Sequence, residues 1–169
     1  IHGMGEHSGR YNYVVDVLNN AGISVVAYDQ FGHGRTEGKR GHVANYDMLL
    51  GCVGELTSKM VELAPAKPMF LFGHSMGGNV LLNYLLRRNP KINGAIVSAP
   101  LFNLAFDAPA IQFKLFKLVS GLLCGLVQAS KLDVKAISRD PKEVQRYVDD
   151  SLVHDKISTG FFVGVHEAG

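Results

Sequence analysis

A G-x-S-x-G pattern formed by Gly73, Ser75 and Gly77 constrains the fold of this chain more than any other feature. The apolar run 68–72 before it predicts a short buried strand, and the spacing of apolar residues in 79–88 predicts a helix. Between a strand and a helix, the pattern is typical of a nucleophile elbow, in which small neighbours let the two elements pack closely. Ser75 would then lie at the amino end of a helix, where the dipole favours negative charge. The alternative interpretation is an ordinary glycine-rich turn.

Predicted strands and helices alternate along the first hundred residues. This alternation predicts an α/β fold with a mostly parallel sheet and right-handed crossovers. The loops that follow the strands would then meet at one edge of the sheet, where ligands bind in such folds. The predicted elements are helices at 11–20 and 46–63, strands at 23–28 and 92–98, and a glycine-rich loop at 31–41.

From residue 101 onward the pattern indicates helices alone. The segment 110–128 predicts one long helix with a wide apolar surface and a polar stripe that includes Lys114 and Lys117. It would pack on the core as a cap, and part of its surface could also meet lipid or a fatty chain. Two lysines near its start argue against a membrane-spanning helix. Shorter helices are predicted from Asp140 to Val148 and from Asp155 onward, so the chain divides into a core, 1–100, and a helical cap insertion, 101–169.

Composition limits the possible partners and cofactors. A net charge of +2 with scattered basic residues gives no reason to expect nucleic-acid binding. Cys52 and Cys124 lie in apolar helical stretches without metal-type spacing, which predicts buried thiols in a reducing, cytoplasmic compartment. His166-Glu167 resembles the start of a zinc-binding helix, but the second histidine is absent, so no metal or other cofactor is expected.

Both ends of the sequence have the character of interior segments. Ile1-His2-Gly3 resembles the last residues of a strand, and the predicted final helix ends without a following element. We therefore expect the chain to be a fragment of a longer protein, incomplete at both ends.

The segment His2-Gly3-Met4-Gly5 predicts a second part of an acyl-transfer site. Such a site needs a nucleophile, a general base and N–H donors for the oxyanion. In an α/β-hydrolase the donors are the backbone N–H after the serine, here Met76, and one from a loop after an earlier strand, here Met4. For the glycines, the alternative interpretation is an ordinary tight turn.

Three ordered segments, 2–11, 29–38 and 73–78, together resemble the monoacylglycerol lipase and lysophospholipase branch of the α/β-hydrolases. The resemblance is clear over residues 1–100 and looser over the cap. The motifs are HGMGEHSGRY, DQFGHGRTEG and GHSMGG. The resemblance implies that Ser75 is the nucleophile and that the substrate is an ester of one fatty acyl chain with glycerol or a similar small alcohol. It also implies possible peripheral contact of the cap with a membrane.

The resemblance further assigns a polar pocket for the alcohol to Glu6, Arg10 and His74, with Tyr147 as the tyrosine contributed by the cap. Two of these assignments have alternatives that depend on the residues alone. Arg10 could simply pair with Glu6 at the start of a helix. His74 could pack beneath the elbow.

The sequence departs from the family pattern in its catalytic triad. The family order is serine, acid, histidine, and the last two residues belong to core segments after the cap. Cap aspartates with His154 or His166 are not expected to take their place, since aspartates at helix starts are usually N-caps. The chain by itself is thus expected to be inactive. Two other functions stay open: a thioesterase or serine peptidase on the same core, and a non-catalytic ligand-binding module.

Overall fold

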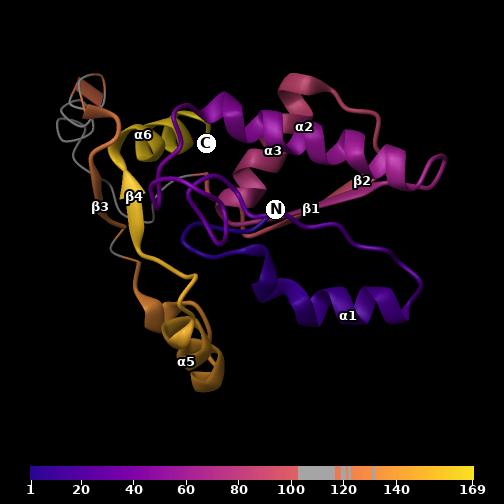
Figure 1. The fold of residues 1–169 in the computed structure, drawn as a ribbon, viewed down its shortest axis with the longest axis horizontal. Coiled ribbons are helices and arrows are strands. Elements are labelled where there is room, and N and C mark those ends of the chain that lie inside the picture. Colours follow the sequence, from indigo (N-terminus) through magenta and orange to yellow (C-terminus); the bar gives the residue numbers. More distant parts are fainter. Residues whose placement is uncertain (103–116, 119–120, 122, 131) are drawn as a thin grey trace.

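The computed structural model describes residues 1–102, 117–118, 121, 123–130 and 132–169 (Figure 1). In chain order the elements of these residues are η1 (Ser8–Tyr11), α1 (Asn12–Asn20), α2 (Tyr46–Leu63), β1 (Phe70–His74), α3 (Met76–Arg88), β2 (Gly94–Ser98), β3 (Val127–Ala129), η2 (Val134–Ala136), α5 (Pro141–Asp149), β4 (Lys156–Ser158) and α6 (Thr159–Glu167).

A parallel pair of strands, β1 and β2, positions the site. Their register runs from Phe70 opposite Gly94 to His74 opposite Ser98, which confirms the predicted parallel pairing. Ile1 extends the pairing on the other edge of β1, because its amino group donates to Phe72 O at 2.7 Å and its carbonyl accepts from His74 N at 3.1 Å. Helices α2 and α3 lie on one side of the strands and α1 on the other, so both sides carry helices as the α/β prediction requires (Figure 1).

The prediction of a strand at 23–28 is wrong for the described part of the chain. The segment forms no backbone ladder with any described residue, and Ile23 and Val26 are 52% and 39% exposed. After this run Gln30 anchors the chain, because its N donates to His2 Nε2 at 2.9 Å and its Nε2 donates to His2 O at 2.7 Å. A β-branched composition favours extended backbone, but a strand exists only where a neighbour supplies the hydrogen bonds.

One hydrophobic cluster joins the first and last parts of the chain. Helices α2 and α3 contribute most of its buried residues, and α6 adds Phe161 and Val165. The prediction of a core at 1–100 and a cap at 101–169 stays a prediction, but α6 belongs to the same hydrophobic cluster as α2 and α3. The other buried members are Val43, Leu49, Leu50, Val53, Leu71, Met76, Val80, Leu81, Tyr84 and Ile157.

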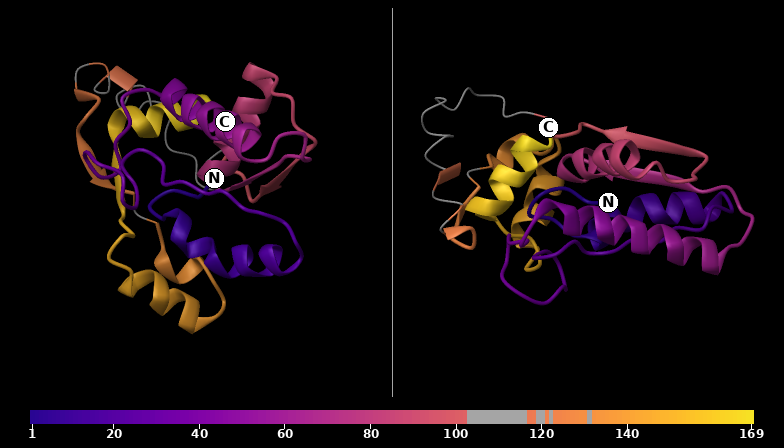
Figure 2. Two further views of the ribbon diagram at one scale, coloured as in Figure 1. Left: turned by 45° about the vertical axis from the view of Figure 1, so that its right-hand side comes forward. Right: turned by 90° about the horizontal axis from the view of Figure 1, so that it is seen from above.

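The segment that follows the core contains strands that the sequence analysis did not predict. β3 and β4 pair antiparallel, with Val127 opposite Ser158, so the predicted helix 110–128 is wrong at its end. Most of that helix, 110–116 with 119, 120 and 122, lies outside the described residues. Figure 2 shows the paired strands at one end of the molecule, beside α6.

Helix starts in this region depend on which side chain caps them. Asp140 caps α5 as predicted, with Oδ1 accepting from Lys142 N at 2.9 Å. The prediction that Asp155 starts the last helix is wrong. Residues 156–158 pair in β4, and the cap is Ser158, whose Oγ accepts from Phe161 N at 3.3 Å. Serine is as good an N-cap as aspartate, so strand pairing decides between them.

The two cysteines differ in exposure. Cys52 in α2 is half-buried, whereas Cys124 is exposed, and neither forms a disulfide. The prediction of a buried thiol is therefore wrong at Cys124. Its apolar surroundings in sequence indicated a buried helical face, but the chain turns at 124–125 and leads into β3.

Candidate active site

Ser75 has a strained backbone conformation between β1 and α3. Its φ of 53° and ψ of −120° lie in a region that residues with a Cβ rarely adopt, at a cost of about 1–3 kcal/mol. Four backbone hydrogen bonds hold it there. Ser75 N donates to Ser98 O at 3.0 Å, and Ser75 O accepts from Leu101 N at 3.0 Å and from Gly78 N and Asn79 N of α3 at 2.9 and 3.1 Å. The strand–turn–helix geometry predicted from the G-x-S-x-G pattern is therefore present.

The two glycines of the pattern are required by close backbone packing. A Cβ on Gly73 would lie 2.5 Å from Gly77 O. A Cβ on Gly77 would collide with the carbonyl oxygen of Ile1 and lie 2.5 Å from His2 O. Real Cβ atoms do not approach oxygen this closely, so the elbow tolerates only glycine at both positions.

The loop 3–6 lies directly against Ser75. A Cβ on Gly3 would be 3.2 Å from the Ser75 Cβ. No acceptor among the described residues takes the Met4 N–H, and Met76, as the first residue of α3, has no intrahelical acceptor for its own N–H. Two backbone donors thus stay available on the segments that flank the serine.

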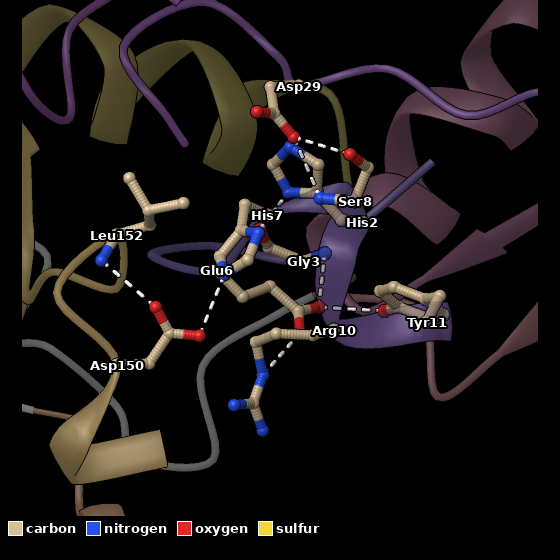
Figure 3. A network of polar contacts seen from close by, with 10 residues as sticks. All are labelled: His2, Gly3, Glu6, His7, Ser8, Arg10, Tyr11, Asp29, Asp150 and Leu152. Atoms are coloured by element: carbon tan, nitrogen blue, oxygen red, sulfur yellow. Dashed lines mark hydrogen bonds and ion pairs between the residues drawn. The ribbon is translucent and has the colours of Figure 1, made fainter. Parts of the chain in front are cut away.

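The carboxylate of Glu6 organises this loop (Figure 3). Its Oε1 accepts from Gly3 N at 2.6 Å and from the Tyr11 hydroxyl at 2.7 Å, and its Oε2 lies 3.5 Å from Arg10 Nε. The Glu6 side chain is only 15% exposed. Burial and the neighbouring negative charge of Glu6 both raise the pKa of Tyr11, which keeps its hydroxyl a proton donor.

Arg10 connects this network to the helix α5. Its guanidinium carbon lies 4.9 Å from the centroid of the Tyr147 ring, a cation–π distance. The structure therefore brings together Glu6, Arg10 and Tyr147, three of the four residues expected to form a polar pocket. It also shows the alternative interpretation of Arg10, an arginine paired with Glu6 at the start of a helix.

His74, the fourth of these residues, has a different set of contacts. Its Nδ1 lies 3.2 Å from Ser98 Oγ, so the ring spans the ends of β1 and β2. Among the described residues, it forms no hydrogen bond or ion pair with Glu6, Arg10 or Tyr147. Among the described residues, His74 is thus not part of the polar network that links Glu6, Arg10 and Tyr147.

No described histidine forms a hydrogen bond with Ser75. Six of the seven histidines in the sequence have hydrogen-bond partners elsewhere, and the ring of the seventh, His166, stacks on Phe162. The pairs are His2 with Gly3 and Gln30, His7 with Asp150, His33 with Phe31, His42 with Ser158, His74 with Ser98, and His154 with Gly32 and Lys156.

The sequence analysis missed two carboxylates, Asp29 and Asp150, that bind the residues directly after the loop 3–6. Asp29 accepts from Ser8 N at 2.8 Å, Ser8 Oγ at 2.7 Å and Arg35 N at 2.8 Å. Burial alone would raise the Asp29 pKa, but these hydrogen bonds outweigh it and lower the pKa. Asp150 accepts from His7 Nε2 at 2.8 Å. Ser8 and Asp29 are 21 residues apart, and His7 and Asp150 are 143 residues apart, so no local spacing could have indicated these two pairs.

The segment 150–154 also touches the loop through its backbone. His154 N donates to Gly5 O at 2.9 Å, and a Cβ on Gly5, where φ is +73°, would collide with His154 O. Gly5 thus allows both the left-handed backbone and this close approach.

Three histidines pack together behind the loop: His2 and His33 are buried, and His154 is half-buried. The His2 and His33 ring centroids are 5.3 Å apart, and those of His33 and His154 are 4.8 Å apart. Burial lowers the pKa of His33 to about 3 and also lowers the pKa of His2 and His154. Among the described residues, no group of histidine, cysteine and carboxylate side chains could hold a metal ion. The cluster is therefore a neutral part of the packing.

We expect this cluster to make the folded state sensitive to acid. An unfolded histidine takes up a proton as the pH falls below about 6.5, whereas folded His33 does so only near pH 3. Stability should therefore be greatest above pH 6.5 and fall as the pH is lowered toward 3. In His33→Gln, proton uptake on unfolding between pH 6 and 4 should decrease by about one proton.

Denaturant midpoints measured over this pH range would test the expectation. The difference between His33→Gln and the unmodified protein at pH 8 gives the packing cost of the substitution, since the histidine is neutral there in both states. An unchanged pH dependence in the variant would contradict a neutral, buried His33.

The comparisons with known proteins agree with this geometry. A family model described as "Serine aminopeptidase, S33" (Hydrolase_4) matches residues 1–169. The chain belongs to this α/β-hydrolase family. The predicted α/β-hydrolase fold is confirmed, and so is the resemblance of this Hydrolase_4 chain to the monoacylglycerol lipase branch.

Three relatives illustrate the similarity. A monoacylglycerol lipase of Mycolicibacterium smegmatis is 34% identical over 153 residues, which cover 90% of this chain and 54% of the relative. Human monoglyceride lipase is 33% identical over 153 residues, with 90% and 50% covered. The crystal structure of the Paleococcus ferrophilus monoacylglycerol lipase superposes with a TM-score of 0.89 at 36% identity, covering 99% of this chain and 63% of that one. This Hydrolase_4 chain thus spans about half the length of these curated relatives.

Proposed function

We propose that the protein carrying this chain is a serine hydrolase that cleaves carboxylic esters of a single fatty acyl chain, such as a monoacylglycerol or a lysophospholipid. The observation that carries the proposal is the strained Ser75 at the end of β1, packed against the loop that follows Gly3. The similarity to proteins named monoacylglycerol or monoglyceride lipase supports the substrate class.

In the proposed reaction, the Ser75 oxygen attacks the ester carbonyl while a general base takes the hydroxyl proton. The carbonyl oxygen becomes negatively charged and accepts hydrogen bonds from the backbone N–H groups of Met4 and Met76. Collapse of this intermediate releases the alcohol, which takes the proton from the base, and leaves an acyl-enzyme. Water, activated by the same base, then frees the fatty acid and restores the serine.

We assign the general base to a part of the protein outside residues 1–169. The hydrogen bonds of six histidines lead away from Ser75, and the relatives are about twice as long as the matched chain. A serine without a base stays protonated and is a weak nucleophile. The chain on its own is therefore expected to be inactive.

For the alcohol, we propose a polar pocket formed by Arg10 and Tyr147, with His74 next to the nucleophile. Arg10 and Tyr147 lie side by side and approach the loop from opposite parts of the chain. Their donors suit a glycerol hydroxyl or a phosphate ester. The carboxylate of Glu6 already accepts hydrogen bonds from Gly3 N and the Tyr11 hydroxyl and is paired with Arg10, which favours a different role for it.

Contact with a membrane surface and a cytoplasmic location stay proposals. No helix in the described part of the chain is long and apolar enough to cross a bilayer. Leu118, Leu123 and Leu126, at the edge of the cap region, are 68%, 57% and 52% exposed. Exposed leucines suit a surface that receives a lipid substrate.

A substrate panel on the intact protein would test the proposed function against a peptidase. We expect kcat/KM for a monoacylglycerol to exceed that for an aminoacyl anilide by at least on the order of 10². An aminopeptidase needs a free carboxylate for the substrate ammonium group, whereas the Glu6 carboxylate next to Ser75 is paired with Arg10.

The opposite preference would contradict the ester assignment. Fluorophosphonate labelling of the intact protein separates an enzyme from a binding module, because this reagent labels only an activated serine rapidly. Absence of labelling together with absence of hydrolysis would leave the ligand-binding interpretation.

A further inference from the structure

The carboxylate of Glu6 is directed into the protein. Its Oε1 receives two donors, Gly3 N at 2.6 Å and the Tyr11 hydroxyl at 2.7 Å, while Oε2 faces Arg10 Nε at 3.5 Å. Figure 3 shows these three partners converging on one carboxylate. Hydrogen bonds to an ionised acceptor are among the strongest in proteins. A residue held in this way is better suited to fixing a structure than to exchanging partners with a substrate.

The bond to Gly3 constrains the backbone on both sides of Met4. It closes a short turn from residue 3 to residue 6, which encloses Met4 and Gly5. It also occupies the Gly3 N–H, so the next donor on the loop is Met4. Gly3 itself packs against Ser75, with an added Cβ at 3.2 Å from the serine Cβ. A small displacement of this turn would therefore move the Met4 N–H relative to the nucleophile.

Tyr11 connects the same carboxylate to the sheet. Its ring meets the Phe72 ring edge-on, with centroids 5.9 Å apart, and Phe72 lies three residues before Ser75 on β1. The loop and the elbow thus share one rigid support. On the other side, Arg10 balances the negative charge of Glu6, which is 15% exposed and would otherwise oppose an oxyanion nearby.

We propose that Glu6 is a positioning residue for the oxyanion loop: through Gly3 it sets the Met4 N–H in place for the transition state, and it does not contact the alcohol. This inference rests on the proposed function, since it needs an acyl-transfer site at Ser75. It predicts that loss of Glu6 impairs the chemical step equally for every ester, whatever its alcohol.

The test compares Glu6→Leu and Glu6→Gln in the intact protein with a monoacylglycerol and with p-nitrophenyl acetate. Leucine removes the acceptor, so kcat should fall on the order of 10² on both substrates, as for loss of an oxyanion donor, with little change in KM. Glutamine keeps one acceptor oxygen for Gly3 N and should restore most of kcat. The matched control Glu62→Leu, which removes a 65% exposed glutamate on α2, should behave like the unmodified protein.

Affinity for a trifluoromethyl ketone gives a second readout. This inhibitor forms a tetrahedral oxyanion on the serine, so its binding should weaken across the variants in proportion to kcat, whereas inhibition by glycerol should not change. If Glu6 has only a structural role, its loss should lower the unfolding midpoint, but inhibitor affinity should not follow kcat and glutamine should not restore kcat. That result would overturn the proposal.

Other outcomes are equally decisive. A raised KM for the monoacylglycerol with normal turnover of p-nitrophenyl acetate would show that Glu6 binds the alcohol. If the unmodified protein neither hydrolyses an ester nor reacts with a fluorophosphonate, the proposed function itself fails, and the inference with it. An active unmodified protein with fully active Glu6→Leu overturns the inference alone.

Discussion

Replacing Ser75 by alanine should lower kcat for ester hydrolysis on the order of 10⁶, the effect seen where nucleophile and base act as a unit. The methyl group cannot accept the acyl chain, and the N–H groups of Met4 and Met76 can provide only residual stabilisation of the transition state. The measurement is hydrolysis of a monoacylglycerol by the intact protein, together with loss of fluorophosphonate labelling. Retention of more than a few per cent of the activity would exclude Ser75 as the nucleophile.

Two further variants separate chemistry from folding. Ser58→Ala, an exposed serine on α2, should leave both hydrolysis and labelling unchanged. Ser75→Gly should be as inactive as Ser75→Ala but more stable, by about 1 kcal/mol, because glycine adopts the backbone of residue 75 without the Cβ penalty. Equal stability of the alanine and glycine variants would show that the φ of 53° carries little strain.

Replacing Gly77 by alanine should have the largest effect on stability. The added Cβ would collide with Ile1 O and lie 2.5 Å from His2 O, and backbone oxygens at the edge of a sheet cannot move aside without breaking its hydrogen bonds. We expect the free energy of unfolding to fall by about 3 kcal/mol or more. Activity should be lost as well, because relief of the clash moves the 1–3 segment away from the elbow.

Gly51→Ala is the matched control for this prediction. Gly51 is an exposed residue within α2, and nothing lies within 4 Å of its added Cβ. Alanine there should raise the free energy of unfolding by about 0.5–1 kcal/mol through helix propensity alone. Denaturant unfolding of both variants measures the contrast. A Gly77→Ala protein as stable as Gly51→Ala would mean that the close approach of residues 1–2 to the elbow does not exist in solution.

Elements whose signals are local were predicted well from the sequence. The helix predicted at 46–63 has the observed bounds of α2, Tyr46–Leu63, since an Asn45 cap and a regular apolar face define both its start and its buried side. The elbow belongs to the same class, because its small neighbours and strained serine are sequence requirements of one turn. The Asp140 cap of α5 is a third example.

Elements that need a distant partner were predicted poorly. The apolar run 23–28 has strand composition but no ladder among the described residues. Conversely, Lys156–Ser158 became β4 because Val127–Ala129 lies beside it, which moved the helix start from Asp155 to Ser158. Hydrogen-bond pairing across tens of residues leaves no periodic trace in either segment alone.

By itself, the sequence determined the chemistry that this chain can offer: a serine on a strained turn, flanked by glycines, and a glycine-rich loop whose motif places a glutamate and an arginine next to it. Each of these depends on the conformational limits of a few adjacent residues. Only the tertiary structure decided how they are used. It turned the Glu6 carboxylate inward to Gly3 and Tyr11, placed Arg10 on Tyr147, and placed His74 against Ser98. The physical reason is that hydrogen bonds and ring contacts depend on distances of a few ångströms between residues up to 137 positions apart, which only the packed fold establishes.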